Sequence, residues 1–186
     1  MTMKHIHFSI VVLLLTVLIS STSWAALAPD ETDQFNGQDA PDFSVQTLSG
    51  DTISLKAWRG HPVLLNFFAS WCPPCRQEIA DLMQFHARYA PKGLVIIGAA
   101  TDAKLIPETS REKERKDVEG FVSRLKIPYA ITIAEPDLLT PYHFKGIPTI
   151  VFITREGKIV KVFYGYHSRQ QVEKVLKKIM ADKKEK

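Results

Sequence analysis

The chain has 186 residues, 45% of them hydrophobic, which suits one folded domain and leaves little room for a second. Its 24 Lys and Arg against 20 Asp and Glu give a net charge of +4, and both signs are interspersed along the chain. No concentrated basic face is expected, which argues against nucleic acid as a partner.

The N-terminal residues have the pattern of an export signal. A positively charged start is followed by an apolar run over residues 8–19 and then by small polar residues. Ser23 and Ala25 are small residues at the two positions that a signal peptidase checks, so cleavage after Ala25 is expected. We therefore predict a signal peptide over 1–25 and a flexible linker over 26–36. The alternative is that the apolar run, shorter than the roughly 20 residues that span a bilayer, is retained as an anchor. In both cases the domain would work in the periplasm, where disulfides persist.

Residues 37–182 carry the periodicities of a mixed α/β domain. The predicted strands, including a hairpin formed by the first two, cover 43–48, 52–55, 63–69, 94–100, 129–133, 149–153 and 159–164. The predicted helices, with apolar residues at three- and four-residue spacing, are one over 76–89, one with an apolar stripe from Val118 to Leu125, and one that begins at Ser168.

The only two cysteines, Cys72 and Cys75, lie two residues apart between a predicted strand and a predicted helix. A structural disulfide across so short a loop would restrict the unfolded chain very little. A structural zinc site needs four ligands, yet the chain has no further cysteine. His61, His86, His143 and His167 are scattered one by one, as surface or interface histidines are. The remaining interpretation is a dithiol that cycles between its reduced and oxidised states.

The surroundings of the dithiol predict its chemistry. Cys72 is expected at the N-cap of the helix, where the amide dipoles favour a thiolate, and Cys75 would point inward one turn later. Pro73 and Pro74 fall at the first two helical positions, which tolerate proline because their N–H groups have no intrahelical partner. They also remove two donors and leave the amide of Cys75 nearest to the thiolate. We therefore expect a moderate thiolate pKa and a reducing dithiol.

A charged segment over residues 104–116 fits the pattern less smoothly. Thr109 and Glu112 have the spacing of a capping box for the helix that follows. We interpret the segment as a solvated helical extension. The alternative is a surface that contacts a partner protein near the rim of the active site.

Three stretches of the chain together resemble one protein family. They are APDFSVQTLSGDTISLKAWRG, NFFASWCPPCRQE and GIPTIVFITREGKIV. Over roughly residues 37–180 the chain is similar to the TlpA/ResA-like extracytoplasmic thiol-disulfide oxidoreductases of the thioredoxin superfamily. The resemblance implies a thioredoxin-like three-layer α/β sandwich, in which helices flank a central mixed sheet, with an N-terminal β-hairpin extension.

The resemblance also assigns the site residues. It makes Cys72 the attacking thiol and Cys75 the resolving thiol, joined in a disulfide when oxidised. It implies a cis peptide bond at Pro148 beside the dithiol, where the backbone of Ile147 would meet an extended substrate; the alternative is an ordinary strand-entry proline. Trp71, directly before the first cysteine, is the second expected substrate-binding residue. No metal and no cofactor are expected.

Two carboxylates near the dithiol receive different interpretations. Cytosolic thioredoxins carry a buried aspartate where this chain has Asn66, and an amide cannot act as the base for the inner thiol. In this respect the chain resembles members of the family that place an acidic residue after the next strand. Asp102 is therefore expected as a proton relay to Cys75, with a strand-end cap as the alternative. Glu78, one turn past Cys75, is expected on the solvated helix surface.

These features predict an enzyme, a protein-disulfide reductase of exported proteins such as apocytochrome c or proteins with a copper-site cysteine pair. A membrane thiol-disulfide reductase would return its electrons, and we expect a monomer. The alternative is a Cu(I) metallochaperone with Cys72 and Cys75 as soft ligands, although such chaperones tend to use a longer spacing and a histidine. A peroxidase would carry Thr and Pro just before its cysteine, where this chain has Ala69, Ser70 and Trp71.

Overall fold

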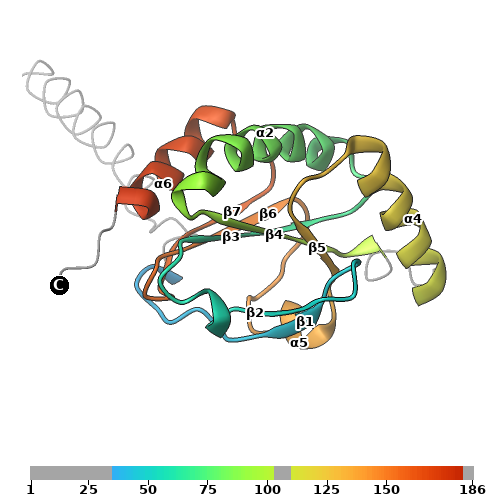
Figure 1. Ribbon diagram of the computed structural model, residues 1–186, viewed down its shortest axis with the longest axis horizontal. Helices are drawn as coiled ribbons and strands as arrows, with labels where there is room; N and C mark the ends of the chain where they lie inside the picture. The colour runs from blue at the N-terminus through green and yellow to red at the C-terminus, as the bar shows by residue number, and fades with distance from the viewer. Residues whose placement is uncertain (1–34, 103–109, 182–186) are drawn as a thin grey trace, which may run out of the picture. The chain divides into compact units, whose positions relative to one another are not determined.

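The computed structural model describes residues 35–102 and 110–181. Its central strands are β3 (Val63–Phe68), β4 (Val95–Ala100), β5 (Ala130–Ile133), β6 (Thr149–Ile153) and β7 (Ile159–Tyr164). They form one mixed sheet in the order β5-β4-β3-β6-β7 (Figure 1). Strands β3, β4 and β5 are parallel, β6 is antiparallel to β3, and β7 is antiparallel to β6.

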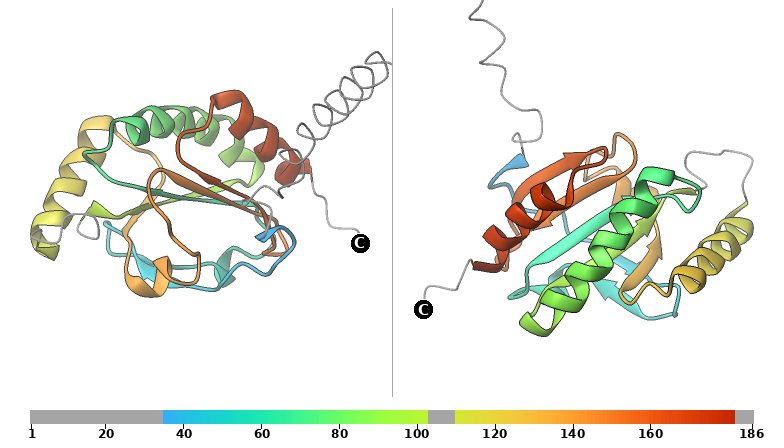
Figure 2. Two further views of the ribbon diagram at one scale, coloured as in Figure 1. Left: turned by 180° about the vertical axis from the view of Figure 1, so that it is seen from behind. Right: turned by 90° about the horizontal axis from the view of Figure 1, so that it is seen from above.

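Helices cover one face of this sheet. They are α2 (Pro73–Tyr89), α4 (Arg111–Leu125) and α6 (Arg169–Ala181), and Figure 2 shows them side by side over the strands. The N-terminal hairpin and the short helix α5 (Pro136–Leu139) cover the other face. Two single-turn 3₁₀ helices are η2 (Lys56–Trp58) and η3 (Ala90–Lys92). The expected α/β sandwich with a central mixed sheet and an N-terminal hairpin is confirmed.

Strand β3 explains why the core has two sides. Leu64 and Phe68 belong to the core under the helices, whereas Leu65 and Phe67 belong to the core under the hairpin. Because neighbouring residues of a strand point to opposite faces, Asn66 lies on the helix face, where it is fully buried. A polar side chain is thus placed directly beneath the helices.

The expected hairpin is present as β1 (Ser44–Gln46) and β2 (Thr52–Ser54), which pair in antiparallel fashion. Its turn contains Gly50 with a φ of 94°, in the left-handed region that glycine enters without steric cost. The hydroxyl of Ser49 donates to the carboxylate of Asp51 at 2.8 Å. Glycine and short polar residues therefore form the turn of the hairpin.

Residues 37–48, here called the crossing segment, hydrogen-bond to both edge strands of the sheet. At its start, the amide of Gly37 donates to the carbonyl of Ile159 in β7 at 2.7 Å. At its end, the amide of Leu48 donates to the carbonyl of Ile131 in β5 at 2.8 Å. A backbone hydrogen bond therefore attaches the turn end of the hairpin to the edge of the central sheet.

Phe35, the first described residue, belongs to the same compact unit as the central sheet. The Phe35 ring is buried and stacks on His143, with ring centroids 5.1 Å apart. The expected signal peptide, 1–25, lies outside the described residues. Within the described ranges, no helix is both long and apolar enough to cross a membrane.

Helix α4 begins differently from the expectation. Its N-cap is Ser110, whose hydroxyl accepts a hydrogen bond from the amide of Lys113 at 3.2 Å. The prediction of a capping box by Thr109 and Glu112 is therefore wrong, because the neighbouring serine takes the N-cap position. Thr109 itself lies outside the described residues, and Glu112 instead pairs with a lysine one turn later at 2.7 Å.

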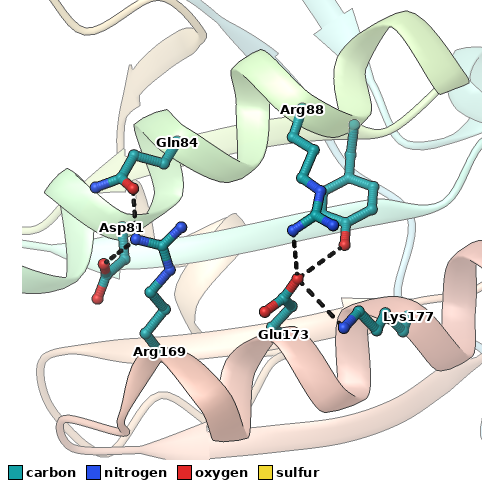
Figure 3. Close-up of polar contacts among 7 residues, drawn as sticks. Asp81, Gln84, Arg88, Arg169, Glu173 and Lys177 are labelled. Carbon is teal, nitrogen blue, oxygen red and sulfur yellow. Dashed lines mark hydrogen bonds and ion pairs between the residues drawn. The ribbon is translucent and has the colours of Figure 1, made fainter.

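Polar contacts join α2 to α6 (Figure 3). Glu173 of α6 accepts hydrogen bonds from Arg88 at 2.8 Å and from the hydroxyl of Tyr89 at 3.1 Å. Arg169 lies 3.8 Å from the carboxylate of Asp81. The Tyr89 hydroxyl, more than the neighbouring cations, holds the pKa of Glu173 below its usual range. Helix α2, which carries the dithiol, is thus held on the sheet along the side that faces α6.

Candidate active site

The two cysteines lie where β3 ends and α2 begins. Cys72 is the N-cap of α2, and Pro73 and Pro74 occupy the first helical positions, which confirms both predictions. The Sγ atom of Cys72 accepts a hydrogen bond from the amide of Cys75 at 3.3 Å. A disulfide joins the two residues, so the structure describes the oxidised form. Cys72 is 4% exposed and Cys75 is 0% exposed, so of the two cysteines only Cys72 has any access to solvent.

The loop before β6 lies at the end of β3 that leads to the dithiol, because Thr149 pairs with Phe67. The Ile147–Pro148 peptide bond is cis, as the resemblance implied. Ile147 packs against the buried cluster that contains both cysteines. The loop is held in place because the amide of Gly165 donates to the carbonyl of Pro148 at 2.8 Å and the hydroxyl of Thr149 donates to the carbonyl of Gly146 at 2.7 Å.

Two exposed aromatic side chains flank this region. Trp71, next to the first cysteine, is 44% exposed, and Tyr166 is 40% exposed. Tyr166 follows Gly165, the residue that bonds to Pro148, and its hydroxyl accepts a hydrogen bond from the side chain of Gln77 at 2.8 Å. Tyr166 was not among the expected site residues, and its one signal in the sequence is an aromatic side chain directly after the last strand.

Asp102 is buried and contacts the loop before the dithiol. Its carboxylate accepts hydrogen bonds from the amide of Ser70, at 3.0 and 3.1 Å, and from the Ser70 hydroxyl. The carbonyl of Ser70 in turn accepts from the guanidinium of Arg76, at 3.0 and 3.1 Å. Burial raises the pKa of Asp102. These hydrogen bonds fix the turn from β3 to α2, so the observed contacts of Asp102 are those of a strand-end cap.

Glu78 corrects the sequence prediction. Expected on the solvated surface, it is only 2% exposed, and its Oε1 accepts a hydrogen bond from Asn66 Nδ2 at 2.6 Å. Burial raises its pKa to about 8. Glu78 and Cys75 are three residues apart on α2 and both buried, so they share one face of the helix. Glu78 is therefore a buried acidic group on the same face of α2 as the inner cysteine.

The error over Glu78 has a physical reason. Glutamate in a helix is exposed by default, because burying its charge costs free energy. The signal that pointed to burial was Asn66, a polar residue in a strand that is otherwise apolar and therefore in need of a polar partner.

Metal ligands do not gather in the described part of the chain. Within residues 35–102 and 110–181, no group of three His, Cys, Asp or Glu side chains is close enough to hold a metal ion. The site consists of a cysteine pair at a helix N-terminus, a cis-proline loop and a buried carboxylic acid. This arrangement suits thiol–disulfide exchange, in which a thiolate attacks a disulfide.

Comparisons with known proteins agree with this chemistry. Residues 36–162 match the model of the AhpC/TSA family. The chain belongs to this family. It is similar to the thioredoxin-like protein YneN of Bacillus subtilis, with 32% identity over 167 residues that cover 88% of this chain and 94% of YneN. It is also similar to the thiol-disulfide oxidoreductase ResA of Bacillus thuringiensis, with 31% identity over 172 residues that cover 91% of this chain and 93% of ResA.

The fold is also similar to that of solved structures. The crystal structure of a thiol:disulfide interchange protein of the thioredoxin family from Chlorobium tepidum has a TM-score of 0.67 and 27% identity. The matched region covers 83% of this chain and 100% of the Chlorobium chain. The thioredoxin-like fold and the resemblance to ResA-like proteins are thereby confirmed. This protein is a thiol-disulfide oxidoreductase of the ResA type, and its enzymatic activity is thiol–disulfide exchange.

Proposed function

We propose that this oxidoreductase works as a reductant of disulfides in exported proteins. One observation carries the direction of electron flow: Cys72 Sγ accepts an amide hydrogen bond from Cys75, whereas Pro73 and Pro74 have no N–H to offer. A thiolate with few donors is stabilised less, so its pKa stays high and the dithiol gives up electrons more readily.

The reaction proceeds in two exchanges. The Cys72 thiolate attacks one sulfur of the client disulfide, the client S–S bond breaks, and the second client sulfur leaves as a thiolate. The Cys75 thiolate then attacks Cys72 Sγ, which breaks the bond to the client and forms the Cys72–Cys75 disulfide seen here. Two electrons have passed to the client. A dithiol of a membrane thiol-disulfide reductase returns them by the same steps in reverse.

Glu78 is the proposed proton acceptor for the second exchange, because Cys75 must lose its proton before it attacks. A carboxyl with a pKa of about 8 is close to a thiol, at about 8.5, so the proton can pass between them with little free-energy change. After the transfer Glu78 is neutral, the form that its burial favours. We assign the relay to Glu78 rather than to Asp102, whose hydrogen bonds come from Ser70.

The redox potential tests the proposed direction. Equilibration of the dithiol with glutathione should give a potential below about −200 mV, whereas strong oxidants lie near −120 mV. Replacement of Pro73 and Pro74 by alanine adds two N–H donors, which should lower the Cys72 pKa and raise the potential. Pro91→Ala, in η3 beyond the other end of α2, is the matched control and should change neither. A wild-type potential near −120 mV would contradict the proposal.

The place of action is proposed to be the periplasm, supported by the export pattern of residues 1–25. Apocytochrome c and copper-site cysteine pairs are the proposed clients. The exported form should begin at Ala26, which N-terminal sequencing of the periplasmic fraction can establish. Recovery of the protein only in membranes, with the leader intact, would favour a retained anchor.

A further inference from the structure

Three buried polar atoms between α2 and the sheet have no hydrogen-bond partner among the described residues. They are Asn66 Oδ1 on β3, Glu78 Oε2 on α2, and the hydroxyl of Tyr129 just before β5. A buried polar atom without a partner costs free energy, so native structures satisfy such atoms, often with an ordered water molecule.

The register of the sheet brings the three groups together. Asn66 Nδ2 donates to Glu78 Oε1 at 2.6 Å, so the two oxygens without partners, Asn66 Oδ1 and Glu78 Oε2, belong to side-chain groups that are in direct contact. Gly98 is the register partner of Asn66 on the adjacent strand. The Tyr129 ring lies over this glycine, with Cε2 3.5 Å from the position that a Cβ there would occupy. Cε2 neighbours the carbon that bears the hydroxyl, so this edge of the Tyr129 ring lies over Gly98, on the strand next to the one that carries Asn66.

Electrostatics agree with this proximity. Burial first, and then the charge of Glu78, raise the pKa of Tyr129. The other titratable groups around the pair are Cys75 and Asp81, both on α2, and Asp81 acts on Glu78 through its like charge. His86 faces Tyr129, with ring centroids 5.9 Å apart. Strand β6 contributes a backbone carbonyl, that of Thr149, which accepts from the Asn66 amide at 3.4 Å.

We propose that a buried water molecule binds between Asn66 Oδ1, Glu78 Oε2 and the Tyr129 hydroxyl, and that Tyr129 sets the proton affinity of Glu78 through it. The inference rests on the proton role proposed above for Glu78. It adds to that role a ligand site and a positioning residue, Tyr129.

The hydrogen-bonding capacities of the groups match one water molecule in both protonation states of Glu78. With Glu78 ionised, the water accepts from the Tyr129 hydroxyl and donates to Glu78 and to Asn66 Oδ1. With Glu78 protonated, its O–H donates to the water, which then donates to Asn66 Oδ1 and to the Tyr129 oxygen. Each state gives the water three partners, the usual number for a buried water molecule. Cys75 can therefore exchange its proton with Glu78 while no polar atom of the site is left unpaired.

Tyr129→Phe tests the site, because it removes the hydroxyl and keeps the ring over Gly98. Without this donor the ionised form of Glu78 loses support, so its pKa should rise by about half a unit or more, a threefold change in proton affinity. Carbon-13 NMR titration of the glutamate carboxyls of the oxidised protein measures this shift without any assay of activity. Tyr142→Phe is the control: its hydroxyl donates to the carbonyl of Pro41 at 2.6 Å, and its loss should leave Glu78 unchanged.

A crystal structure of the wild-type oxidised protein provides the second measurement. It should show a water molecule within hydrogen-bond distance of all three atoms, and this test does not depend on the folding of a variant. An empty site would overturn the proposal, as would a Glu78 titration that is the same in Tyr129→Phe and wild type.

Glu78→Gln separates this inference from the proposed function. It should flatten the pH dependence of the rate at which Cys75 resolves a mixed disulfide at Cys72. If it does so while Tyr129→Phe leaves the Glu78 titration unchanged, the water site is refuted and the proton role stands. If Glu78→Gln leaves the rate profile unchanged while Tyr129→Phe shifts the titration and the water is present, the site stands and the proton role is refuted.

Discussion

Cys72 and Cys75 differ in access and in surroundings, although a single turn of helix separates them. A client sulfur can reach only Cys72, whereas Cys75 lies in the apolar layer beneath α2 beside Glu78. A buried thiol without a nearby acceptor would keep its proton and react slowly. In the proposed mechanism this acceptor is Glu78, the buried carboxyl that shares the helix face of Cys75.

Cys75→Ser should accumulate mixed disulfides with clients, because only Cys75 is placed to attack the bond formed at Cys72. Cys72→Ser should form none and should lose disulfide reduction entirely. Non-reducing gels of both variants, expressed with their natural clients, show the adducts. Adducts on the Cys72→Ser variant alone would reverse the two roles.

Asp102→Asn should slow the reaction about equally across the pH range, because it weakens the hydrogen bonds that hold Ser70 and the turn before Cys72. The loss of stability should be about 1 kcal/mol, the usual worth of one such bond. Ser70→Ala removes the hydroxyl donor from the same contact and should reproduce a part of the effect. If Asp102→Asn instead changes the shape of the pH–rate profile, Asp102 is the proton relay that the sequence first suggested.

The sequence predicted those residue features that depend on near neighbours. Cys72 as N-cap and the tolerance of two prolines after it follow from helix capping, which is local. The burial of Glu78 depends on Asn66, twelve residues away on another element, and could not follow from helical periodicity. The cis bond at Pro148 was implied by the family resemblance, since most X–Pro bonds are trans.

Among the elements, the strands were predictable and their neighbours were not. Each central strand lies within one or two residues of its expected range, because apolar runs of strand length mark them clearly. The predicted N-cap of α4 was wrong by one residue. Ser110 and Thr109 are both good N-cap residues, and the local sequence does not distinguish between them. The pairing of β3 with β6 joins segments far apart in the chain, which no local pattern specifies.

Gly98 and Gly120 provide a matched pair of element-scale variants. A Cβ at Gly98 would lie 2.5 Å from Ile131 Cδ1 and 3.1 Å from Phe68 Cε1, inside the packed layer under α2. Gly98→Ala should therefore reduce the free energy of unfolding by about 1–3 kcal/mol. Gly120→Ala lies within α4, where the nearest atom belongs to the flexible side chain of Arg124, and should be neutral or stabilise by up to about 1 kcal/mol.

Urea denaturation of both alanine variants measures these differences. The wild-type protein is the common reference, and the slope against urea should stay constant. If both substitutions change the free energy of unfolding equally, the side chains around Gly98 move to accept a Cβ more easily than their packing suggests.

For the molecule as a whole, Glu78 links stability to pH. Its pKa is about 8 in the folded oxidised protein against 4.5 for an ordinary glutamate, so the folded state holds a proton that the unfolded state has lost between these values. The contribution is fully present below pH 4.5 and is lost as the pH rises through about 8. Between these two pKa values, the free energy of unfolding changes with pH by at most about 1.4 kcal/mol per pH unit.

Glu78→Gln should remove this dependence, so the difference in stability between variant and wild type should change steadily from pH 5 to pH 8. Urea denaturation of the oxidised proteins at several pH values measures the difference. Glu173→Gln is the control of opposite sign: the lowered pKa of Glu173 gives stability that is lost as the pH falls. Parallel stability curves for wild type and Glu78→Gln would mean that Glu78 is ionised in the folded protein.

The crossing segment also affects how the molecule meets its neighbours. Edge strands expose unpaired backbone groups, to which another molecule can add a strand and so begin to aggregate. Here Gly37 bonds to Ile159 of β7 at one edge and Leu48 bonds to Ile131 of β5 at the other, so a single stretch of backbone pairs with a part of each edge strand. A chain that began beyond residue 48 would keep the dithiol and the whole central sheet, yet both edges would be open to self-association.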